Sequence, residues 1–303
     1  MRHAARRALG TTFSTLTGLA ALLIVAMLAL ILFDVAIGGA GHVTWEFLTQ
    51  PPKDGMMGGG IFPALYGTAA LTLLMTLAVM PVGVLTAVYL HEYAPPDSRL
   101  ARWVRVAVVN LAGVPSIVFG LFGLGFFIHF VGGTMDRALG YQELHWAQPG
   151  ILWASLTLAI LTLPVVIVST EEALRAVPMD HRTASLALGA TQSQTLLRVV
   201  LPGALPGILT GAVLAVSRGA GEVAPILFTG AAYFLPDLPT TLNSQFMHLG
   251  YHTYVLATQS PDIEATRPLL YATVLVLLLL TFALNLVAVV IRTRTRRRAA
   301  GGH

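Results

Sequence analysis

The sequence predicts an all-α membrane protein that crosses the bilayer six times and has both termini in the cytoplasm. Of its 303 residues, 55% are hydrophobic and 11% are charged, whereas soluble domains contain about 25% charged residues. The mean hydropathy is +0.75. Six apolar stretches reach the length of about 20 residues that a helix needs to span a bilayer. No cysteine is present, which excludes disulfides, thiolate metal sites and a cysteine nucleophile.

The six predicted spans are distributed along the whole chain. They comprise residues 15–37, 62–90, 106–131, 151–170, 203–229 and 268–291. Pro81, Pro164 and Pro225 lie within the second, fourth and fifth spans, and membrane helices tolerate proline where neighbouring groups satisfy the freed carbonyls. The first apolar run is longer than the roughly 7–15 residues of a signal peptide, so we interpret it as an uncleaved anchor.

This interpretation divides the chain into three parts. Residues 1–60 form the anchor helix and the first outer loop, residues 61–291 form the main transmembrane domain, and residues 292–303 form a basic cytoplasmic tail. The third loop of the main domain, residues 171–202, is polar and contains arginine.

Basic residues predict the orientation of the spans. All but four of the 18 lysines and arginines lie in the termini or in alternate loops, and the exceptions are Lys53, Arg137, Arg218 and Arg267. The positive-inside rule therefore places both termini and the 171–202 loop in the cytoplasm. The charges are dispersed among loops instead of forming one surface, which argues against nucleic-acid binding. The arginines of the tail are expected to contact anionic lipid headgroups.

The outer loops contain turn residues and aromatic residues. Residues 51–60, PPKDGMMGGG, form a flexible turn segment. No G-x-x-x-x-G-K-[ST] motif occurs, so the chain has no P-loop of its own for ATP. The 230–267 loop contains aromatic residues among prolines, which suits a docking surface for another protein or an interfacial aromatic belt. His248 and His252 have a metal-compatible spacing, but without a third ligand nearby we predict no metal site.

The 171–202 loop predicts two short helices joined by a bend. Pro178 favours the first turn of a helix over residues 179–188, and Gly189 stops that helix by adopting a positive φ. Thr191 and Gln194 have the spacing of a capping box at the start of a second helix, which is expected to run to Pro202. Spacing alone favours an ordinary amphipathic loop lying across the membrane surface.

Residues 183–189, TASLALG, followed after nine residues by VVLP, resemble the EAA loop of ABC importer permeases. That pattern is E-A-A, three residues, G, nine residues and then I-x-L-P. The resemblance implies that the loop forms coupling helices which sit in a cleft of an ATPase subunit. Thr183 replaces the glutamate of the pattern, and Asp180 or Glu172 would be the acid that substitutes for it. The other positions carried over are Ala184, Ser185, Gly189, Val199, Leu201 and Pro202.

Three further stretches resemble phosphate-importer permeases of the PstA type. They are residues 61–95, residues 110–127 with the sequence NLAGVPSIVFGLFGLGFF, and residues 218–230 with the sequence RGAGEVAPILFTG. The resemblance implies the ABC type I importer permease fold in a bacterial inner membrane. It implies as partners a PstC-like permease, a dimer of PstB-like ATPase subunits and a PstS-like binding protein. ATP and magnesium would be bound by the ATPase, leaving this chain without a cofactor or enzymatic activity.

A charged pair within the fifth predicted span indicates a path for an anion. A cation near the middle of a span, as predicted for Arg218, costs at least about 2.5–3.5 kcal/mol unless it is paired or solvated. Glu222 follows at i+4 on the same helix face. A structural ion pair is the alternative. We expect Arg218 to stabilise phosphate and Glu222 to hold the guanidinium in place.

Small residues near this pair are predicted to complete the path. Gly219 and Gly221 would let a neighbouring helix or the ligand approach closely. Ser116 and the preceding Gly-Val-Pro interruption would add a hydroxyl and free backbone groups. The implied mechanism is alternating access, driven by the ATPase and supplied by the binding protein.

Three alternatives to phosphate import remain at this point. A sulfate or molybdate permease would use the same cation, because Arg218 attracts any oxyanion. An ion-coupled secondary transporter would be expected to show inverted repeats, and we find no such symmetry. An intramembrane enzyme would need catalytic residues or metal ligands within the spans, where His129 is the only histidine and no H-E-x-x-H motif occurs.

Overall fold

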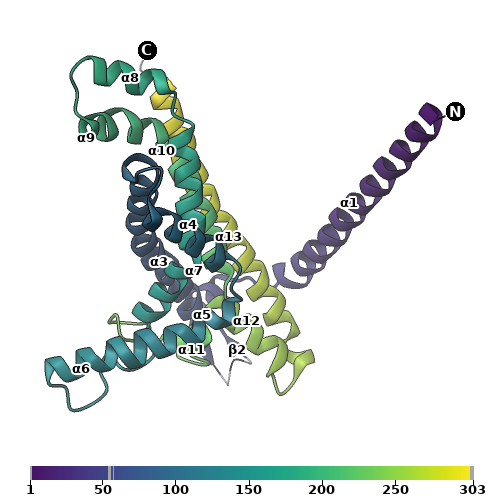
Figure 1. The fold of residues 1–303 in the computed structure, drawn as a ribbon. Helices are drawn as coiled ribbons and strands as arrows, with labels where there is room; N and C mark the ends of the chain where they lie inside the picture. The colour runs from purple at the N-terminus through teal and green to yellow at the C-terminus, as the bar shows by residue number, and fades with distance from the viewer. Residues whose placement is uncertain (1, 54–55, 57, 301–303) are drawn as a thin grey trace.

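Helices form nearly all of the regular structure in the computed structural model, which describes residues 2–53, 56 and 58–300 (Figure 1). Residues 301–303 of the predicted tail, and Asp54, Gly55 and Met57 of the turn segment, lie outside the described residues. The first part of the chain contains α1 (Arg2–Ala40), α2 (Trp45–Thr49), the strands β1 (Pro52–Lys53) and β2 (Gly58–Gly59), α3 (Phe62–Val88), the π-helix η2 (Tyr89–Tyr93) and α4 (Arg99–Ala112).

The second part of the chain begins at Ser116 and contains the remaining helices. They are α5 (Ser116–Phe122), the π-helix η3 (Gly123–Gly132), α6 (Gly133–Leu139), α7 (Ile151–Arg175), α8 (Met179–Ala187), α9 (Gln192–Thr195), the π-helix η4 (Leu196–Val200), α10 (Leu201–Gly221), α11 (Ile226–Thr229), α12 (Leu249–Thr258) and α13 (Ile263–Ala300). β1 and β2 pair as a short antiparallel hairpin with Pro52 opposite Gly59.

Six helical segments of the described chain are long and apolar enough to cross a membrane, as predicted. They are Thr12–Ala40, Phe62–Tyr93, Ser116–Leu139, Ile151–Arg175, Gln192–Gly221 and Ile263–Arg294. Figure 1 shows both chain ends and α8 at one end of the molecule, whereas α6 and the β-hairpin lie at the other. This polarity agrees with the orientation that the basic residues predict.

The helix α7 is the centre of the bundle. It packs against α3 on one side and α10 on another, with α4 and α5 completing its surroundings. Leu158 and Val166 of α7 are fully buried and form a cluster with Leu71 and Met75 of α3 and Ala215 of α10. A helix that is apolar on all faces is expected in such a position.

The third predicted span, residues 106–131, is wrong as a single straight helix. The structure ends α4 at Ala112 and begins a new helical segment at Ser116. Pro115 lacks a backbone N–H and disfavours the helical conformation at Val114, and Gly113 before it has a low helix propensity. In Figure 1 the segment from α5 to α6 consequently runs across the direction of α10 and α13 instead of alongside them.

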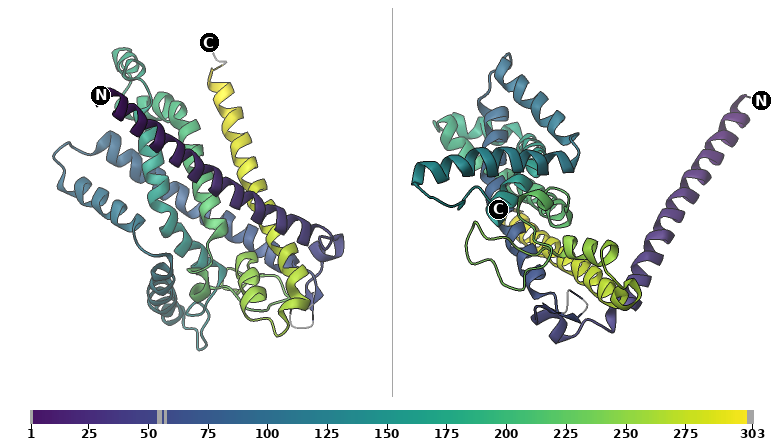
Figure 2. Two further views of the ribbon diagram at one scale, coloured as in Figure 1. Left: turned by 90° about the vertical axis from the view of Figure 1, so that its right-hand side faces the viewer. Right: turned by 90° about the horizontal axis from the view of Figure 1, so that it is seen from below.

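The predicted anchor, α1, extends away from the rest of the molecule in Figure 1 and in the right-hand view of Figure 2. It meets α13 near its C-terminal end, where Gly38 and Gly39 lie so close to Tyr271 that a side chain on either glycine would overlap it. The Tyr271 hydroxyl donates to Asp34 Oδ2 at 3.0 Å. The rest of α1 exposes its apolar side chains, as expected of a helix surrounded by lipid or by another membrane chain.

Asp136 of α6 organises the outer loop that precedes α7. Its carboxylate oxygens accept hydrogen bonds from the backbone N–H groups of His145 at 3.1 Å, Trp146 at 2.8 Å and Ala147 at 2.9 Å. Trp153 Nε1 donates to the Trp146 carbonyl at 2.8 Å. These bonds fix the loop against the start of α7, although its sequence has no secondary-structure signal.

Candidate functional site

The Arg218–Glu222 pair lies at the C-terminal end of α10. Arg218 occupies the last turn, and Glu222 is the C-cap residue, with extended backbone dihedrals of φ −81° and ψ 126°. Arg218 Nε and Glu222 Oε1 are 3.6 Å apart, and the side chains are 39% and 22% exposed. The guanidinium also benefits from the negative end of the helix dipole. The pair is therefore a partly exposed charged group at the end of α10.

The fifth predicted span, residues 203–229, is therefore wrong at both ends, and Arg218 is not at the middle of a helix. The helical segment runs from Gln192 to Gly221. It stops there because glycines at 219 and 221 weaken the last turn and because Pro225 disfavours helix at the residue before it. The apolar stretch continues in the short helix α11. Hydropathy detected the apolar residues but not this interruption.

The two predicted path glycines differ in their surroundings. A Cβ on Gly219 would lie 2.3 Å from Met75 Sδ of α3, so Gly219 allows α10 and α3 to approach closely. A Cβ on Gly221 would meet nothing within 4 Å. Gly219 thus serves helix packing, and Gly221 borders open space next to Glu222.

Ser116 begins α5 directly after the interruption of the third span. In the described chain its hydroxyl makes no hydrogen bond to Arg218 or Glu222, so the structure does not join it to that pair. The two interruptions are nevertheless neighbours, because a Cβ on Gly120 of α5 would contact Pro225 and Phe228, which follow α10.

A polar pair that the sequence interpretation missed lies one residue before Arg218. Asn285 Nδ2 of α13 donates to Ser217 Oγ at 3.3 Å, and Asn285 Oδ1 is buried without a partner among the described residues. An asparagine within the apolar run of the last span was a usable signal, because polar side chains in membrane helices commonly bond to a neighbouring helix.

The first half of the 171–202 loop folds as predicted. The helix α8 begins after Pro178 and is followed by Gly189 with a φ of +84°. Thr191 caps α9 in a capping box, since its side chain accepts from Gln194 N and the Gln194 side chain accepts from Thr191 N. The hydroxyls of Ser185 and Thr195 lie 2.9 Å apart and join the two helices. The hydroxyl of Thr183 bonds to carbonyls of its own helix, to Met179 O and Asp180 O.

The second predicted helix of this loop is not a separate short helix. The chain continues without a break from α9 through η4 into α10, so Val199, Leu201 and Pro202 lie inside the fifth membrane segment. Pro202 follows the π-helix η4 directly and therefore removes one backbone donor inside this continuous segment.

At the tip of the loop several apolar side chains are exposed. Leu188 is 90% exposed and Met179 is 66% exposed, while Ala184 is also at the surface. None of the residues of α8 is buried. The apolar side chains at this tip are therefore not covered by the rest of the described chain.

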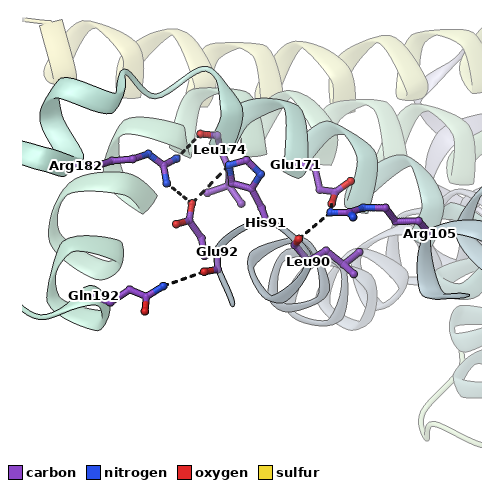
Figure 3. A network of polar contacts seen from close by, with 8 residues as sticks. All are labelled: Leu90, His91, Glu92, Arg105, Glu171, Leu174, Arg182 and Gln192. Atoms are coloured by element: carbon purple, nitrogen blue, oxygen red, sulfur yellow. Dashed lines mark hydrogen bonds and ion pairs between the residues drawn. The ribbon is translucent and has the colours of Figure 1, made fainter. Parts of the chain in front are cut away.

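A network of charged side chains at the base of this loop was not predicted (Figure 3). Arg182 of α8 donates from Nη1 to Glu92 Oε1 at 2.6 Å and from Nη2 to the Leu174 carbonyl at 2.7 Å. Gln192 Nε2 of α9 donates to the Glu92 carbonyl at 2.9 Å. Glu92 and Arg182 are 90 residues apart, so no local pattern connects them.

Residues 79–298 match the family described as "Binding-protein-dependent transport system inner membrane component". The match covers most of the chain and includes the 171–202 loop. The chain belongs to this family of ABC importer permeases. It is therefore a membrane transport component and not an enzyme, and ATPase and substrate-binding protein partners follow from the family.

The permease is similar to several bacterial proteins. It is 34% identical to the probable ABC transporter permease protein YqgI of Bacillus subtilis (strain 168), over 82% of this chain and 84% of that protein. It is 41% identical to the phosphate transport system permease protein PstA 1 of Mycobacterium tuberculosis (strain CDC 1551 / Oshkosh), over 56% of this chain and 50% of that protein. It is 32% identical to PstA of Xylella fastidiosa (strain 9a5c), over 78% of each chain.

Solved structures show the same fold as the permease. A bacterial ABC transporter involved in the import of alginate superposes with a TM-score of 0.60 at 16% identity, over 90% of this chain and 95% of that chain. The MetNI methionine ABC transporter superposes with a TM-score of 0.58 at 19% identity, over 77% and 94%. The fold is that of ABC type I importer permeases, as predicted.

The outer face of the permease contains an open cavity of about 720 Å³. It lies between the loop before α7 and the loop before α12, and its polar lining comes from Gln148, Asp237, Thr240, Asn243 and Gln245. Of the aromatic residues noted in the 230–267 loop, Tyr233, Phe234 and Tyr254 are exposed at this end of the molecule. The outer face thus combines a polar hollow with exposed rings.

His248 and His252 of the permease are buried, with exposed fractions of 0% and 4%. His248 Nδ1 accepts from Gly250 N at 3.1 Å, whereas His248 Nε2 and His252 Nδ1 have no partner among the described atoms. Burial lowers the pKa of both imidazoles from 6.5 to about 4, because the charged form is poorly solvated there. The described residues contain no group of three or more potential metal ligands.

These histidines predict acid sensitivity of the permease. A lowered pKa means that the unfolded chain binds more protons than the native one as the pH falls from 6.5 towards 4. Stability should thus be nearly full at pH 7.5 and fall by on the order of 2 kcal/mol for each histidine, or about 4 kcal/mol for both, by pH 5. Thermal unfolding in detergent at pH 7.5 and pH 5.0 measures this loss. The H248Q/H252Q variant should lose less between the two pH values than the wild type, and an equal loss in both would contradict the assignment.

Proposed function

We propose that the chain is the transmembrane permease subunit of an ATP-driven inorganic phosphate importer. The observation that carries this proposal is the similarity over most of both chains to a permease named for phosphate transport. The half-exposed Arg218–Glu222 pair supports it, because a guanidinium offers charge-assisted hydrogen bonds to phosphate oxygens. Glu222 holds the guanidinium and prevents the anion from binding too tightly to be released.

The two ends of the molecule fit two kinds of partner. The exposed apolar side chains of α8, together with Asp180, Thr183 and Ser185, form the surface for a PstB-like ATPase subunit, which binds ATP and magnesium. The polar hollow and exposed rings of the outer face suit a PstS-like phosphate-binding protein. A PstC-like permease or a second copy of this chain encloses the path, and the assembly lies in a bacterial inner membrane.

The transport cycle is alternating access. ATP closes the two ATPase subunits, and the loop containing α8 and α9 carries that movement into the membrane helices. The chamber between the two permeases then opens outward and receives phosphate from the binding protein. Ser116, Gly219 and Gly221 belong to the wall of this path in the proposal, with Gly219 contributing through close packing of α10 on α3.

Uptake into proteoliposomes tests the proposal. The chain is reconstituted with a PstC-like permease and a PstB-like ATPase, and radioactive phosphate and the binding protein are supplied outside. We expect uptake to require ATP inside, to persist when ion gradients are dissipated, and to resist a large excess of sulfate or molybdate. Uptake driven by an ion gradient alone would instead identify a secondary transporter, and equal competition by sulfate would identify a general oxyanion permease.

Substitution of Gly189 by valine tests the coupling role of the loop. Gly189 has a φ of +84°, which costs an L residue roughly 1–2 kcal/mol, and a β-branched residue more. No atom lies within 4 Å of its Cβ position, so the effect is on the backbone bend alone. We expect severalfold weaker co-purification of the ATPase. G125A, at a helical glycine that is equally open, should leave co-purification unchanged, and unchanged association in G189V would count against the coupling role.

A further inference from the structure

Both helices of the cytoplasmic loop are attached to one residue at the end of α3. The carboxylate of Glu92 accepts a hydrogen bond from Arg182 Nη1 of α8 at 2.6 Å, and the backbone carbonyl of Glu92 accepts one from Gln192 Nε2 of α9 at 2.9 Å (Figure 3). Tyr93 Oη and Ser193 Oγ lie at 3.5 Å beside them. The loop is thus connected to the second membrane segment as well as to the fourth and fifth, which it joins in sequence.

The end of α3 is itself held from the opposite side. The π-helix η2 continues α3 and ends at Tyr93, so its last carbonyls have no partner within the helix and are available to side chains. Arg105 of α4 donates to the Leu90 carbonyl at 2.8 Å and to Glu171 Oε1 of α7 at 3.2 Å (Figure 3). Arg105 therefore ties the segment that contains Glu92 to α4 and α7, so this helix end does not fray.

The Glu92–Arg182 pair is the principal attachment of α8. The two side chains are 11% and 12% exposed, so solvent screens their attraction weakly. Arg182 also donates to the Leu174 carbonyl of α7 at 2.7 Å, and Ser185 contacts the Thr195 hydroxyl of α9, but α8 contains no buried residue. A cavity of about 390 Å³ lies beside the pair, lined by Met179, Leu186 and Leu196 among others. Without the pair, α8 has room to shift.

We propose that the Glu92–Arg182 pair is the joint through which movement of the coupling helices reaches α3. This inference rests on the proposed coupling of the loop to an ATPase. The helix α3 continues from this joint to Phe62 at the outer end and packs along its length on α7 and α10. At Met75 it contacts Gly219, next to Arg218. A displacement of α8 therefore moves α3, and with it the part of the proposed path next to Arg218. Glu92 and Arg182 act as positioning residues.

Charge substitutions separate this role from simple docking of the ATPase. In the reconstituted complex, R182Q and E92Q should each reduce ATP-dependent phosphate uptake at least tenfold while the ATPase still co-purifies and hydrolyses ATP. The exchanged pair, E92R/R182E, should recover part of the coupling between hydrolysis and uptake. R99Q is the matched control, since Arg99 is exposed on the same side and has no ion-pair partner among the described residues.

A distance measurement tests the joint directly. The chain has no cysteine, so His181→Cys on α8 and Leu77→Cys on α3 introduce a single pair of spin-label sites, both at exposed residues. With the pair intact, the distance between the labels should be the same without nucleotide and in an ATP-trapped state. In R182Q the ATP-trapped distance should change and its distribution should broaden, because α8 moves without α3.

The outcomes separate failure of this inference from failure of the proposed function. An unchanged label distance in R182Q, uptake equal to R99Q, or loss of ATPase association in place of loss of coupling would each overturn the joint. Transport of an anion other than phosphate leaves the distance test valid, because the test requires only ATP and the ATPase. Absence of any ATPase association with the wild-type chain would overturn both.

Discussion

Replacing Arg218 with glutamine should reduce ATP-dependent phosphate uptake by about 10- to 100-fold, the value of one charge-assisted hydrogen bond of about 1.5–3 kcal/mol. The guanidinium is the cation beside the end of α10, and it is exposed enough to receive an anion. Glutamine keeps a donor and much of the length of the side chain but removes the charge. Uptake by proteoliposomes with equal amounts of inserted protein measures the effect.

Two further variants show which property of Arg218 matters. R218K keeps the charge but not the planar fork, so it should retain part of the uptake. E222Q should leave the guanidinium less restrained and slow release, which lowers the maximal rate more than the apparent affinity for phosphate. If R218Q inserts correctly and transports phosphate at the wild-type rate, Arg218 is a structural residue with no part in the path.

Gly67→Ala should strongly destabilise the permease. A Cβ at this position would lie 2.1 Å from the Met247 carbonyl oxygen, which belongs to the backbone and cannot rotate away. Separating the two segments would also break the buried bond from Leu249 N to Thr68 Oγ1 at 2.9 Å. The steric overlap and the unpaired Leu249 N–H together lower the free energy of unfolding by about 3–5 kcal/mol. This corresponds to a fall of roughly 5–10 °C or more in the unfolding midpoint.

Thermal unfolding of the purified permease in detergent measures this effect. Gly125→Ala is the control, because its Cβ position has no atom within 4 Å. It should leave the midpoint within about a degree of the wild type, since surface substitutions usually change stability little. A midpoint for G67A equal to that of G125A would show that the segment 246–249 does not pack on α3 as the structure describes.

The bend at Gly189 and the capping box of Thr191 and Gln194 are confirmed, because both depend on groups within a few residues of one another. The length of the third and fifth spans was predicted wrongly. Gly113 and Pro115 in one, and Gly221 and Pro225 in the other, interrupt helices inside stretches whose hydropathy is continuous.

At the candidate site, too, the pair of residues close in sequence was predicted correctly and the contact between distant residues was missed. Arg218 and Glu222 are correctly recognised as a pair, at 3.6 Å, because they are four residues apart on one turn. Ser116 was grouped with them for its hydroxyl and for the helix interruption before it, and the structure shows no bond between Ser116 and the pair in the described chain. Glu92 was overlooked, because a lone acid at the end of an apolar run does not reveal that Arg182 reaches it from another loop.

The sequence by itself determined the class of protein, the number and orientation of its membrane segments, the bend of the cytoplasmic loop and the family. Hydropathy, charge distribution and capping are properties of short stretches of chain, so they can be recognised without the fold. Only the tertiary structure decided where the helices stop, which glycines pack and which merely border open space, and that Glu92 joins both coupling helices to α3. Those features depend on atoms brought together from distant parts of the chain, and on which of two competing local preferences the packing favours.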